Sequence, residues 1–346
     1  MEKFSDEYKR KLATLLRDKR EAMGLSQIKL AEELGKEEED RWICSDRYLR
    51  DIEAGRVVPS RFILEKLMDA LDIDILEWDQ EQYREVRVSF DNECESIIRL
   101  IFARKYDEAY EWYLALEKEE YYDKNKLHYK QYLKYLEASL LVFKIGLKIA
   151  LGQENISALE VALLKAIEAI RLSKPSIQKK NGDIDTLYIE QNVFNLVEYR
   201  LIGVIANCIK RSDRMDEAKG IYESVLKSLE GDLVDEELQL KLIPLFSYNI
   251  SNILLDHNNE YKGALEICQK GIHYSSIKGI NEVMPYLKYN EGKALWGLKE
   301  PKDLYFLKSH KCFKESRMLF ELMGDLHNAG LVRALTYENY GLHWYD

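Results

Sequence analysis

The sequence predicts an all-α protein in which a small N-terminal helical domain precedes a right-handed solenoid of helical hairpins. The 346-residue chain has only five prolines and almost no segment in which apolar and polar residues alternate. A single pattern recurs in the C-terminal region, in which a small residue near a helix start is followed by larger ones about four and eight positions on. The length is sufficient for two or three domains.

Short capped helices predict the N-terminal domain. A first helix is expected from about Ser5 to Met23, and Gly24 can take the positive φ that ends it. Ser26 and Ser45 are each placed to cap a further short helix through the side-chain hydroxyl. The apolar residues of these two helices are Leu30, Ala31 and Leu34 in one and Leu49 and Ile52 in the other.

This order of helices resembles the XRE/Cro-type helix-turn-helix, in which the second short helix lies in the DNA major groove. The resemblance is carried by Gly24-Leu25-Ser26-Gln27 and by Ser45-Asp46-Arg47-Tyr48-Leu49-Arg50. It implies that Gln27 touches a phosphate and that base edges are read by Asp46, Arg47 and Arg50. Lys29, Ser45 and Arg56 are better placed for the DNA backbone. It also implies an internal ion pair between Arg20 and Glu53.

The connection between the two short helices is longer than this family has. Lys36 to Ile43 stand where about three or four residues are usual, and this insert would either swing the recognition helix or extend one helix by a turn. The charge is also unusual for a nucleic-acid binder, because the chain carries −10 overall. Residues 1–75 hold 15 Lys and Arg against 18 Asp and Glu, so DNA binding is expected to depend on a local patch with a shallow salt dependence.

Composition points away from membranes, metals and catalysis. No apolar run approaches the length of a membrane span and the N-terminus lacks a signal sequence, so a cytoplasmic protein is expected. The five cysteines are scattered with no CxxC pair, which is typical of reduced, buried thiols. No phosphate-binding loop, zinc motif or nucleophile elbow is present, and the six histidines are scattered. We therefore expect no enzyme activity, no metal and no cofactor.

The C-terminal region reads as helical hairpins with the shape of tetratricopeptide (TPR) repeats. Second helices are expected to begin near Tyr106, Met215 and Tyr261, with weaker copies around Ala162 to Ile170 and Ser309 to Phe320. Partner helices are expected over 89–103, 127–151, 187–211, 240–257 and 283–298, with a cap over 326–344. The predicted domains are 1–78 for the helix-turn-helix, 79–88 for a linker that can be helical, and 89–346 for the repeats.

The combination of the two regions resembles the RRNPP regulators of Gram-positive bacteria over essentially the whole chain. That resemblance implies a homodimer that binds double-stranded DNA and is switched by a short signalling peptide held in the concave groove of the repeats. Asparagine amides can grip a peptide backbone because they donate and accept hydrogen bonds. The candidate peptide-binding residues are Asn192, Asn195, Tyr199, Asn207, Tyr248, Asn249, Asn252, Tyr289 and Asn290. The alternative for these residues is that they only tie adjacent helices together.

The function that the sequence favours is therefore a peptide-controlled transcription regulator. The alternative is a TPR module that sequesters another protein and uses its helix-turn-helix for docking or dimerisation. Arg47, Arg50 and Arg56 favour DNA, whereas the acidic insert and the negative balance of the N-terminal residues favour the alternative.

Overall fold

The computed structural model describes residues 6–35, 43–119, 122, 124–150, 157–277, 282–298 and 302–343. These residues are helical apart from their turns and loops and one isolated antiparallel bridge between Gln178 and Ile184. The all-α prediction is confirmed. The chain forms two compact units, residues 1–96 with 114–129 and residues 97–113 with 130–346, and each is described separately.

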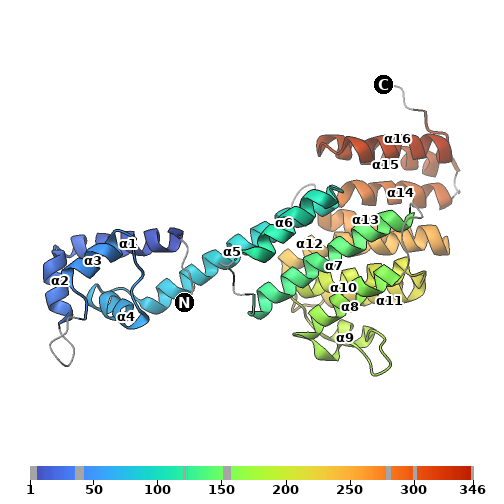
Figure 1. The fold of residues 1–346 in the computed structure, drawn as a ribbon. Coiled ribbons are helices and arrows are strands. Elements are labelled where there is room, and N and C mark those ends of the chain that lie inside the picture. Colours follow the sequence, from blue (N-terminus) through green and yellow to red (C-terminus); the bar gives the residue numbers. More distant parts are fainter. Residues whose placement is uncertain are drawn as a thin grey trace. The chain divides into compact units, whose positions relative to one another are not determined.

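Four helices form the core of the first unit, drawn in blue in Figure 1: α1 (Asp6–Ala22), α2 (Gln27–Leu34), α3 (Asp46–Glu53) and α4 (Arg61–Ala70). Their apolar faces bury a common cluster that includes Leu16, Leu30, Leu49 and Leu67. Trp78, at the start of the helix that follows, joins this cluster. The two short helices at the centre of the sequence motif are thus held by the burial of the apolar positions that predicted them.

Three helices contribute residues to both units, α5 (Ile75–Phe102), α6 (Tyr106–Lys118) and α7 (Leu127–Ala150). In the first unit Phe90 of α5 packs edge to face against Tyr122 and Tyr129, with ring centroids 4.9 and 4.7 Å apart. Because α5 is continuous, the predicted linker at 79–88 lies within a helix, while the boundaries of the predicted domains stay predictions.

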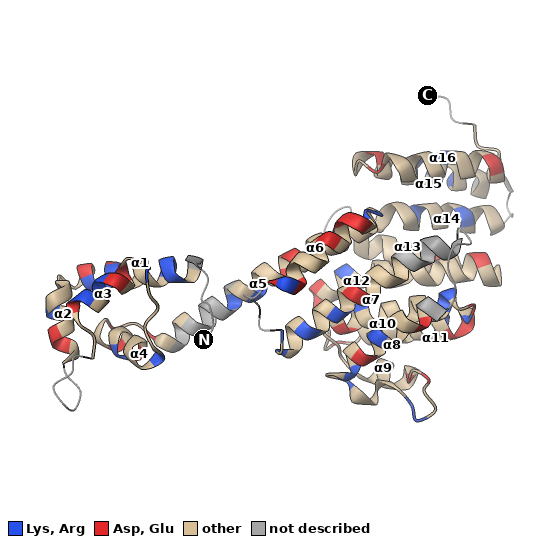
Figure 2. Ribbon diagram, viewed as in Figure 1, with Lys and Arg blue, Asp and Glu red and all other residues tan. Residues whose placement is uncertain are grey.

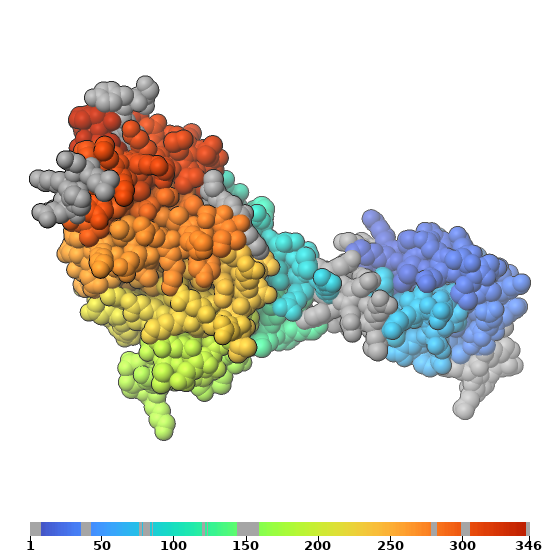
Figure 3. Space-filling model, turned by 180° about the vertical axis from the view of Figure 1, so that it is seen from behind, coloured from blue at the N-terminus to red at the C-terminus, as the bar shows by residue number. Residues whose placement is uncertain are grey.

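The second unit stacks hairpins along the chain. Its long helices are α7 (Leu127–Ala150), α8 (Ser157–Arg171), α10 (Leu196–Arg211), α11 (Met215–Leu229), α12 (Glu236–Ile253), α13 (Tyr261–Ile277), α14 (Met284–Leu298), α15 (Lys302–Leu322) and α16 (Leu326–Tyr340). From α10 onward each of these helices packs against the next, and α8 packs against α10. Figure 3 shows the repeats of this unit as consecutive bands of colour. The unit is the TPR-like solenoid that the sequence predicts.

The small residues that predicted the second helices lie at buried helix contacts. Ala109, Ala162, Ala218 and Ala264 have no exposed surface. A larger side chain at these positions would force neighbouring helices apart, because interiors are close-packed. The recurring small residue is therefore a packing requirement of the hairpin.

The expectation of one helix from Leu187 to Arg211 is wrong. The chain forms the short α9 (Thr186–Gln191), leaves the helix, and starts again as α10. A capping box causes the restart, since Asn195 Oδ1 accepts from Glu198 N–H at 3.0 Å and Glu198 Oε2 accepts from Asn195 N–H at 2.8 Å. Consequently Asn192 and Asn195 do not share a helix face with Tyr199.

In the described portion of the chain, no helix is long and apolar enough to cross a membrane.

Candidate nucleic-acid interface and solenoid cavity

The two short helices of the N-terminal domain begin at the predicted serine caps. Ser26 Oγ accepts a hydrogen bond from Lys29 N–H, and Ser45 Oγ accepts one from Tyr48 N–H, both at 3.2 Å. Each serine therefore satisfies a backbone donor that the first turn of its helix leaves free. Gly24, at φ +69°, supplies the left-handed turn between α1 and the first cap.

The acidic insert extends neither helix. α2 ends at Leu34 and α3 begins at Asp46, while most of the insert, Lys36 to Trp42, lies outside the described residues. Its ends are joined, because Ile43 N–H donates to the carbonyl oxygen of Gly35 at 3.2 Å. The helix contacts of α3 with α1 and α2 are retained across the insert.

A buried ion pair joins the end of α1 to the end of α3. Arg20 donates from Nε to Glu53 Oε1 at 2.6 Å and from a guanidinium nitrogen to Oε2 at 2.8 Å, with 9% and 4% of the side chains exposed. This is the pair that the family resemblance implies. A third donor reaches the carbonyl oxygen of Leu25 at 2.8 Å. The hydrogen bonds with Glu53 raise the pKa of Arg20, so the guanidinium stays charged at neutral pH.

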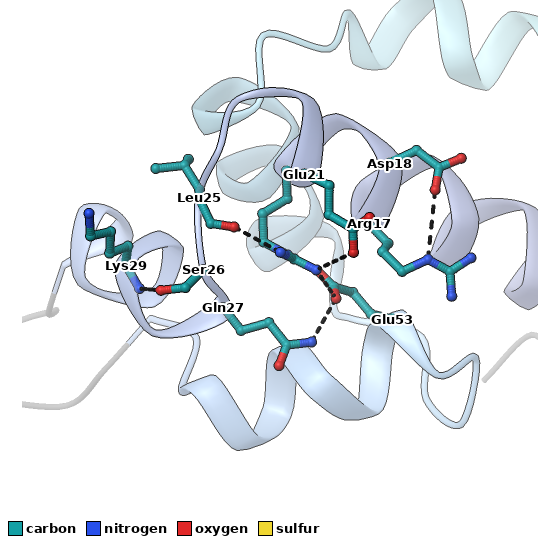
Figure 4. A network of polar contacts seen from close by, with 9 residues as sticks. Arg17, Asp18, Glu21, Leu25, Ser26, Gln27, Lys29 and Glu53 are labelled. Carbon is teal, nitrogen blue, oxygen red and sulfur yellow. Dashed lines mark hydrogen bonds and ion pairs between the residues drawn. The ribbon is translucent and has the colours of Figure 1, made fainter.

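Gln27 joins this network at the start of α2. Its Nε2 donates to Glu53 Oε2 at 2.7 Å (Figure 4). A side-chain amide has two N–H donors, so one can hold Glu53 while the second faces outward. The ion pair therefore orients the residue that the resemblance assigns to a phosphate.

The exposed face of α3 carries its arginines together with acidic partners (Figure 2). Arg50 pairs with Asp46 at 3.2 Å, and Arg56 pairs with Asp51 at 2.8 Å. Arg47 is exposed and has no ion pair with any residue that the structure describes. The exposed pairs Arg50–Asp46 and Arg56–Asp51 can exchange for DNA contacts at little cost, because surface ion pairs contribute little to stability.

The second unit contains a cavity of about 430 Å³, a volume within the range of small-ligand pockets. The first helices of successive hairpins supply most of its wall. α10 contributes one stripe of residues, Arg200, Gly203, Val204, Asn207, Lys210 and Arg211, and α12 contributes Leu245, Phe246, Tyr248, Asn249 and Asn252. The spacing of three or four residues within each stripe places its members on one helix face. α7 adds Tyr135, Ser139 and Phe143.

Four of the nine candidate peptide-binding residues line this cavity: Asn207, Tyr248, Asn249 and Asn252. Two of them also connect helices. Asn249 Oδ1 accepts from Lys210 Nζ at 3.4 Å, and Asn252 Oδ1 accepts from Asn290 Nδ2 at 2.9 Å. These amides thus have both of the roles that the sequence left open, since they tie repeats together and face the cavity.

The other five candidates lie outside the cavity lining and have structural contacts. Asn192 Nδ2 donates to the carbonyl oxygen of Tyr188 at 2.8 Å, and Asn195 caps α10. The hydroxyl of Tyr199 is buried and lies 2.8 Å from Ser228 Oγ. The ring of Tyr289 packs against Phe313 at 5.5 Å, and buried Asn290 bonds Ser251 Oγ at 2.9 Å. Helix capping and contacts between repeats therefore account for this group.

The cations that line the cavity were not among the binding residues predicted from the sequence, which were asparagines and tyrosines. Arg104, Arg200, Lys210 and Arg211 line it, with Glu282 the one acidic residue among the described residues of the lining. Burial, followed by the charge of Arg211, lowers the pKa of Lys210 to about 8. The stripe from Arg200 to Arg211 on α10 was visible in the sequence as a helical face, but its cavity depends on how the other helices pack.

Comparison with known proteins identifies the N-terminal domain and the fold. Residues 11–79 match a family model described as a helix-turn-helix domain, while no curated protein matches the chain. PlcR from Bacillus thuringiensis in complex with the peptide PapR7 and DNA is 19% identical, with a TM-score of 0.55 over 93% of this chain and 99% of that chain. The chain has the PlcR fold. PlcR in its apo form gives a TM-score of 0.60 at 18% identity, over 93% of this chain and 98% of that chain.

Proposed function

We propose that this protein is a peptide-responsive transcription regulator of the RRNPP class. It binds double-stranded DNA through α3 and a short signalling peptide in the cavity of the second unit. The observation that carries the proposal is the presence, in one chain with the PlcR fold, of a helix-turn-helix domain and a cavity lined by amides and aromatic rings. PlcR itself has been crystallised with a peptide and DNA.

On the DNA side, α3 enters the major groove. Arg47 is free to read a base edge, and a guanidinium is suited to guanine O6 and N7. Arg50 and Asp46 contact bases beside it, while Gln27, Lys29, Ser45 and Arg56 hold the phosphate backbone. The exposure of Arg47, Arg50 and Lys29 supports this assignment.

On the peptide side, the amides of Asn207, Asn249 and Asn252 hold the peptide backbone, and Tyr248 contacts its side chains. Tyr248 and Tyr286 form an aromatic wall of the cavity, with ring centroids 5.3 Å apart. Aromatic rings supply contact area at low entropic cost, which suits recognition of a short peptide. Asn192, Asn195, Tyr199, Tyr289 and Asn290 support the wall through helix caps and contacts between repeats.

The protein works as a homodimer in which the peptide shifts the population of solenoid arrangements. A ligand shifts such an equilibrium only as far as its affinity differs between the two states. The peptide must therefore bind one arrangement of the repeats more tightly than the other. No catalytic step belongs to this function.

The alternative is a module that sequesters another protein. It is favoured by the acidic partners of Arg50 and Arg56 on the face that would meet DNA. In that case the helix-turn-helix would serve for docking or dimerisation, and DNA affinity would be absent even at low salt.

The test is fluorescence anisotropy with labelled duplexes that tile the intergenic regions beside the gene, with and without short peptides encoded nearby. We expect sequence-selective binding that one peptide alters. Replacing Arg47 and Arg50 by alanine removes two positive charges and should abolish selective binding. The matched control replaces Lys227 and Lys311, two exposed cations of α11 and α15, and should leave binding intact.

Selective binding that survives R47A/R50A would remove α3 from the DNA interface. No selective binding at low salt, with or without peptide, would favour the sequestering module.

A further inference from the structure

Among the described residues of its lining, the solenoid cavity has more positive than negative charges. Four cations line it and one carboxylate, Glu282, opposes them. Arg200 has interactions of its own, since its guanidinium donates to the Tyr132 hydroxyl at 3.0 Å and lies 5.9 Å from the Tyr135 ring. The positive charge that remains for a ligand therefore lies on Arg104, Lys210 and Arg211, and the last two are adjacent residues near the end of α10.

Lys210 has a hydrogen bond but no carboxylate partner among the described residues. Its ammonium donates to Asn249 Oδ1, and the nearby Asp256 is already paired with Lys293. Lys210 is partly buried, and an ammonium withdrawn from water without a counter-charge is costly, so proteins normally pair such a group or lower its pKa. Lys210 is thus held in a state that an incoming anion would stabilise.

A second polar group of the cavity also lacks a partner. Ser139 of α7 lines the cavity and is 2% exposed, and its hydroxyl has no hydrogen-bond partner within the described ranges of the chain. Buried hydroxyls are nearly always bonded, and those that are not call for an explanation. A polar ligand group inside the cavity would complete it.

We propose that Lys210, Arg211 and Asn207 bind a carboxylate of the peptide. The proposal rests on the proposed function and adds the class of ligand, namely a short peptide whose recognition needs either a free C-terminus or an acidic side chain in the cavity. Two cations and one amide donor form charge-assisted hydrogen bonds with the two carboxylate oxygens. The aromatic rings of Tyr248 and Tyr286 accept the apolar portion beside it.

Titration of Lys210 supplies an independent readout. Its pKa is lowered to about 8 by burial and then by Arg211, whereas Asp256 acts in the opposite direction. The other charged or titratable groups of the lining are Arg104, Arg200, Glu282 and the tyrosines, including Tyr248, whose pKa burial raises. A bound carboxylate raises the pKa of Lys210 again, so binding at pH 8.5 should take up a proton.

The first experiment uses a small probe, because it does not require the natural peptide. Binding of N-acetyl-phenylalanine carboxylate and of its neutral amide is measured by calorimetry on the full chain at pH 8.5, in two buffers of different ionisation enthalpy. We expect about tenfold or greater preference for the carboxylate and uptake of more than about half a proton. Lys210→Met should remove both effects, and Lys227→Met, an exposed lysine of α11, should remove neither.

Folding of each variant is checked by circular dichroism, and Arg211→Gln provides a second variant should Lys210→Met fail to fold. Equal binding of carboxylate and amide by the natural chain would overturn the proposal. A carboxylate preference that persists in both variants would overturn it as well.

A second experiment locates the carboxylate on the peptide. A pool of synthetic heptapeptides is equilibrated with the protein as free acids, as C-terminal amides, and as amides without Asp or Glu, and the retained peptides are identified by mass spectrometry. Loss on amidation assigns the C-terminus, and loss only when acidic residues are also omitted assigns a side chain. Equal retention of all three pools would overturn the carboxylate site.

The two proposals fail separately. A carboxylate preference without any effect of peptide on DNA binding would support the carboxylate site and contradict the proposed function as a regulator. A peptide that alters DNA binding equally well when it has no carboxylate would support the proposed function as a regulator and contradict the carboxylate site.

Discussion

Among single residues, Glu53 has the most demanding position in the first unit. Its two oxygens accept from Arg20 and Gln27, and its side chain is 4% exposed. Buried ion pairs add little net stability compared with apolar residues, but removal of one partner leaves the other charge buried without its partner. The pair therefore acts as a constraint that aligns α1, α2 and α3.

Glu53→Ala should lower the stability of the first unit by about 3–5 kcal/mol, because buried Arg20 keeps only the exposed Glu21 as a counter-charge. Amide hydrogen exchange in α3 of the full chain measures this loss. The double variant Arg20→Leu/Glu53→Leu should lose less than Glu53→Ala. A double variant that is less stable than the single one would contradict this account of the pair.

Lys210 is expected to destabilise the folded protein. Its folded pKa of about 8 lies below the ordinary value of 10.5, so between these values the unfolded chain binds more protons. The contribution of Lys210 to the free energy of unfolding should therefore rise as pH increases from 8 to 10.5. Lys210→Met should stabilise the protein at pH 7 by up to about 3 kcal/mol, measured by urea unfolding. A variant with unchanged stability and pH profile would contradict this expectation.

At the scale of the element, the start of α3 combines an observed helix cap with a proposed DNA contact. Ser45→Ala removes the acceptor of the Tyr48 N–H and should cost about 1 kcal/mol. Ser60 caps α4 in the same way, accepting from Ile63 N–H at 3.5 Å, and Ser60→Ala is the matched control. Both changes should destabilise the unit, whereas only Ser45→Ala should weaken selective DNA binding in anisotropy titrations. Equal loss of DNA affinity in both variants would show that stability alone is responsible.

Close approach of α14 and α15 depends on Gly292. A Cβ at this position would lie 2.5 Å from the Phe313 ring, whereas a Cβ at Gly220 in α11 would meet nothing within 4 Å. Gly292→Ala should therefore destabilise the protein by about 1–3 kcal/mol through overpacking. Gly220→Ala should instead stabilise it by about 1 kcal/mol, because glycine disfavours a helix interior. Thermal unfolding measures both, and the same sign in the two variants would contradict the packing argument.

At the scale of the whole molecule, the proposed function requires two DNA-binding domains on one operator. We expect sedimentation to give a complex of two chains with one duplex, and footprints to show half-sites about 34–36 Å apart or at multiples of that spacing. With two cations, Lys29 and Arg56, assigned to phosphates in each domain, log K should fall with log salt with a slope of about −4. A complex with one chain per duplex would contradict the homodimer.

The sequence by itself determined the helices and their order, because caps, glycines and apolar periodicity act within a few residues. The serine caps at Ser26 and Ser45 and the small residues Ala218 and Ala264 lie where the pattern places them. The break before Asn195 escaped the helical pattern, since Leu187 to Arg211 is apolar at helical spacing and the capping box at Asn195 and Glu198 decides the restart.

Only the tertiary structure decided which polar residues face the cavity. The candidate asparagines have different positions in the fold. Asn207 and Asn249 line the cavity, whereas Asn195 caps a helix and Asn290 forms hydrogen bonds with residues of α12. The burial that lowers the pKa of Lys210 likewise depends on helices far apart in the chain, since its hydrogen-bond partner Asn249 belongs to α12. A local sequence pattern shows which residues share a helix face. Packing between residues far apart in the sequence decides which helix covers that face and what surrounds each charged group.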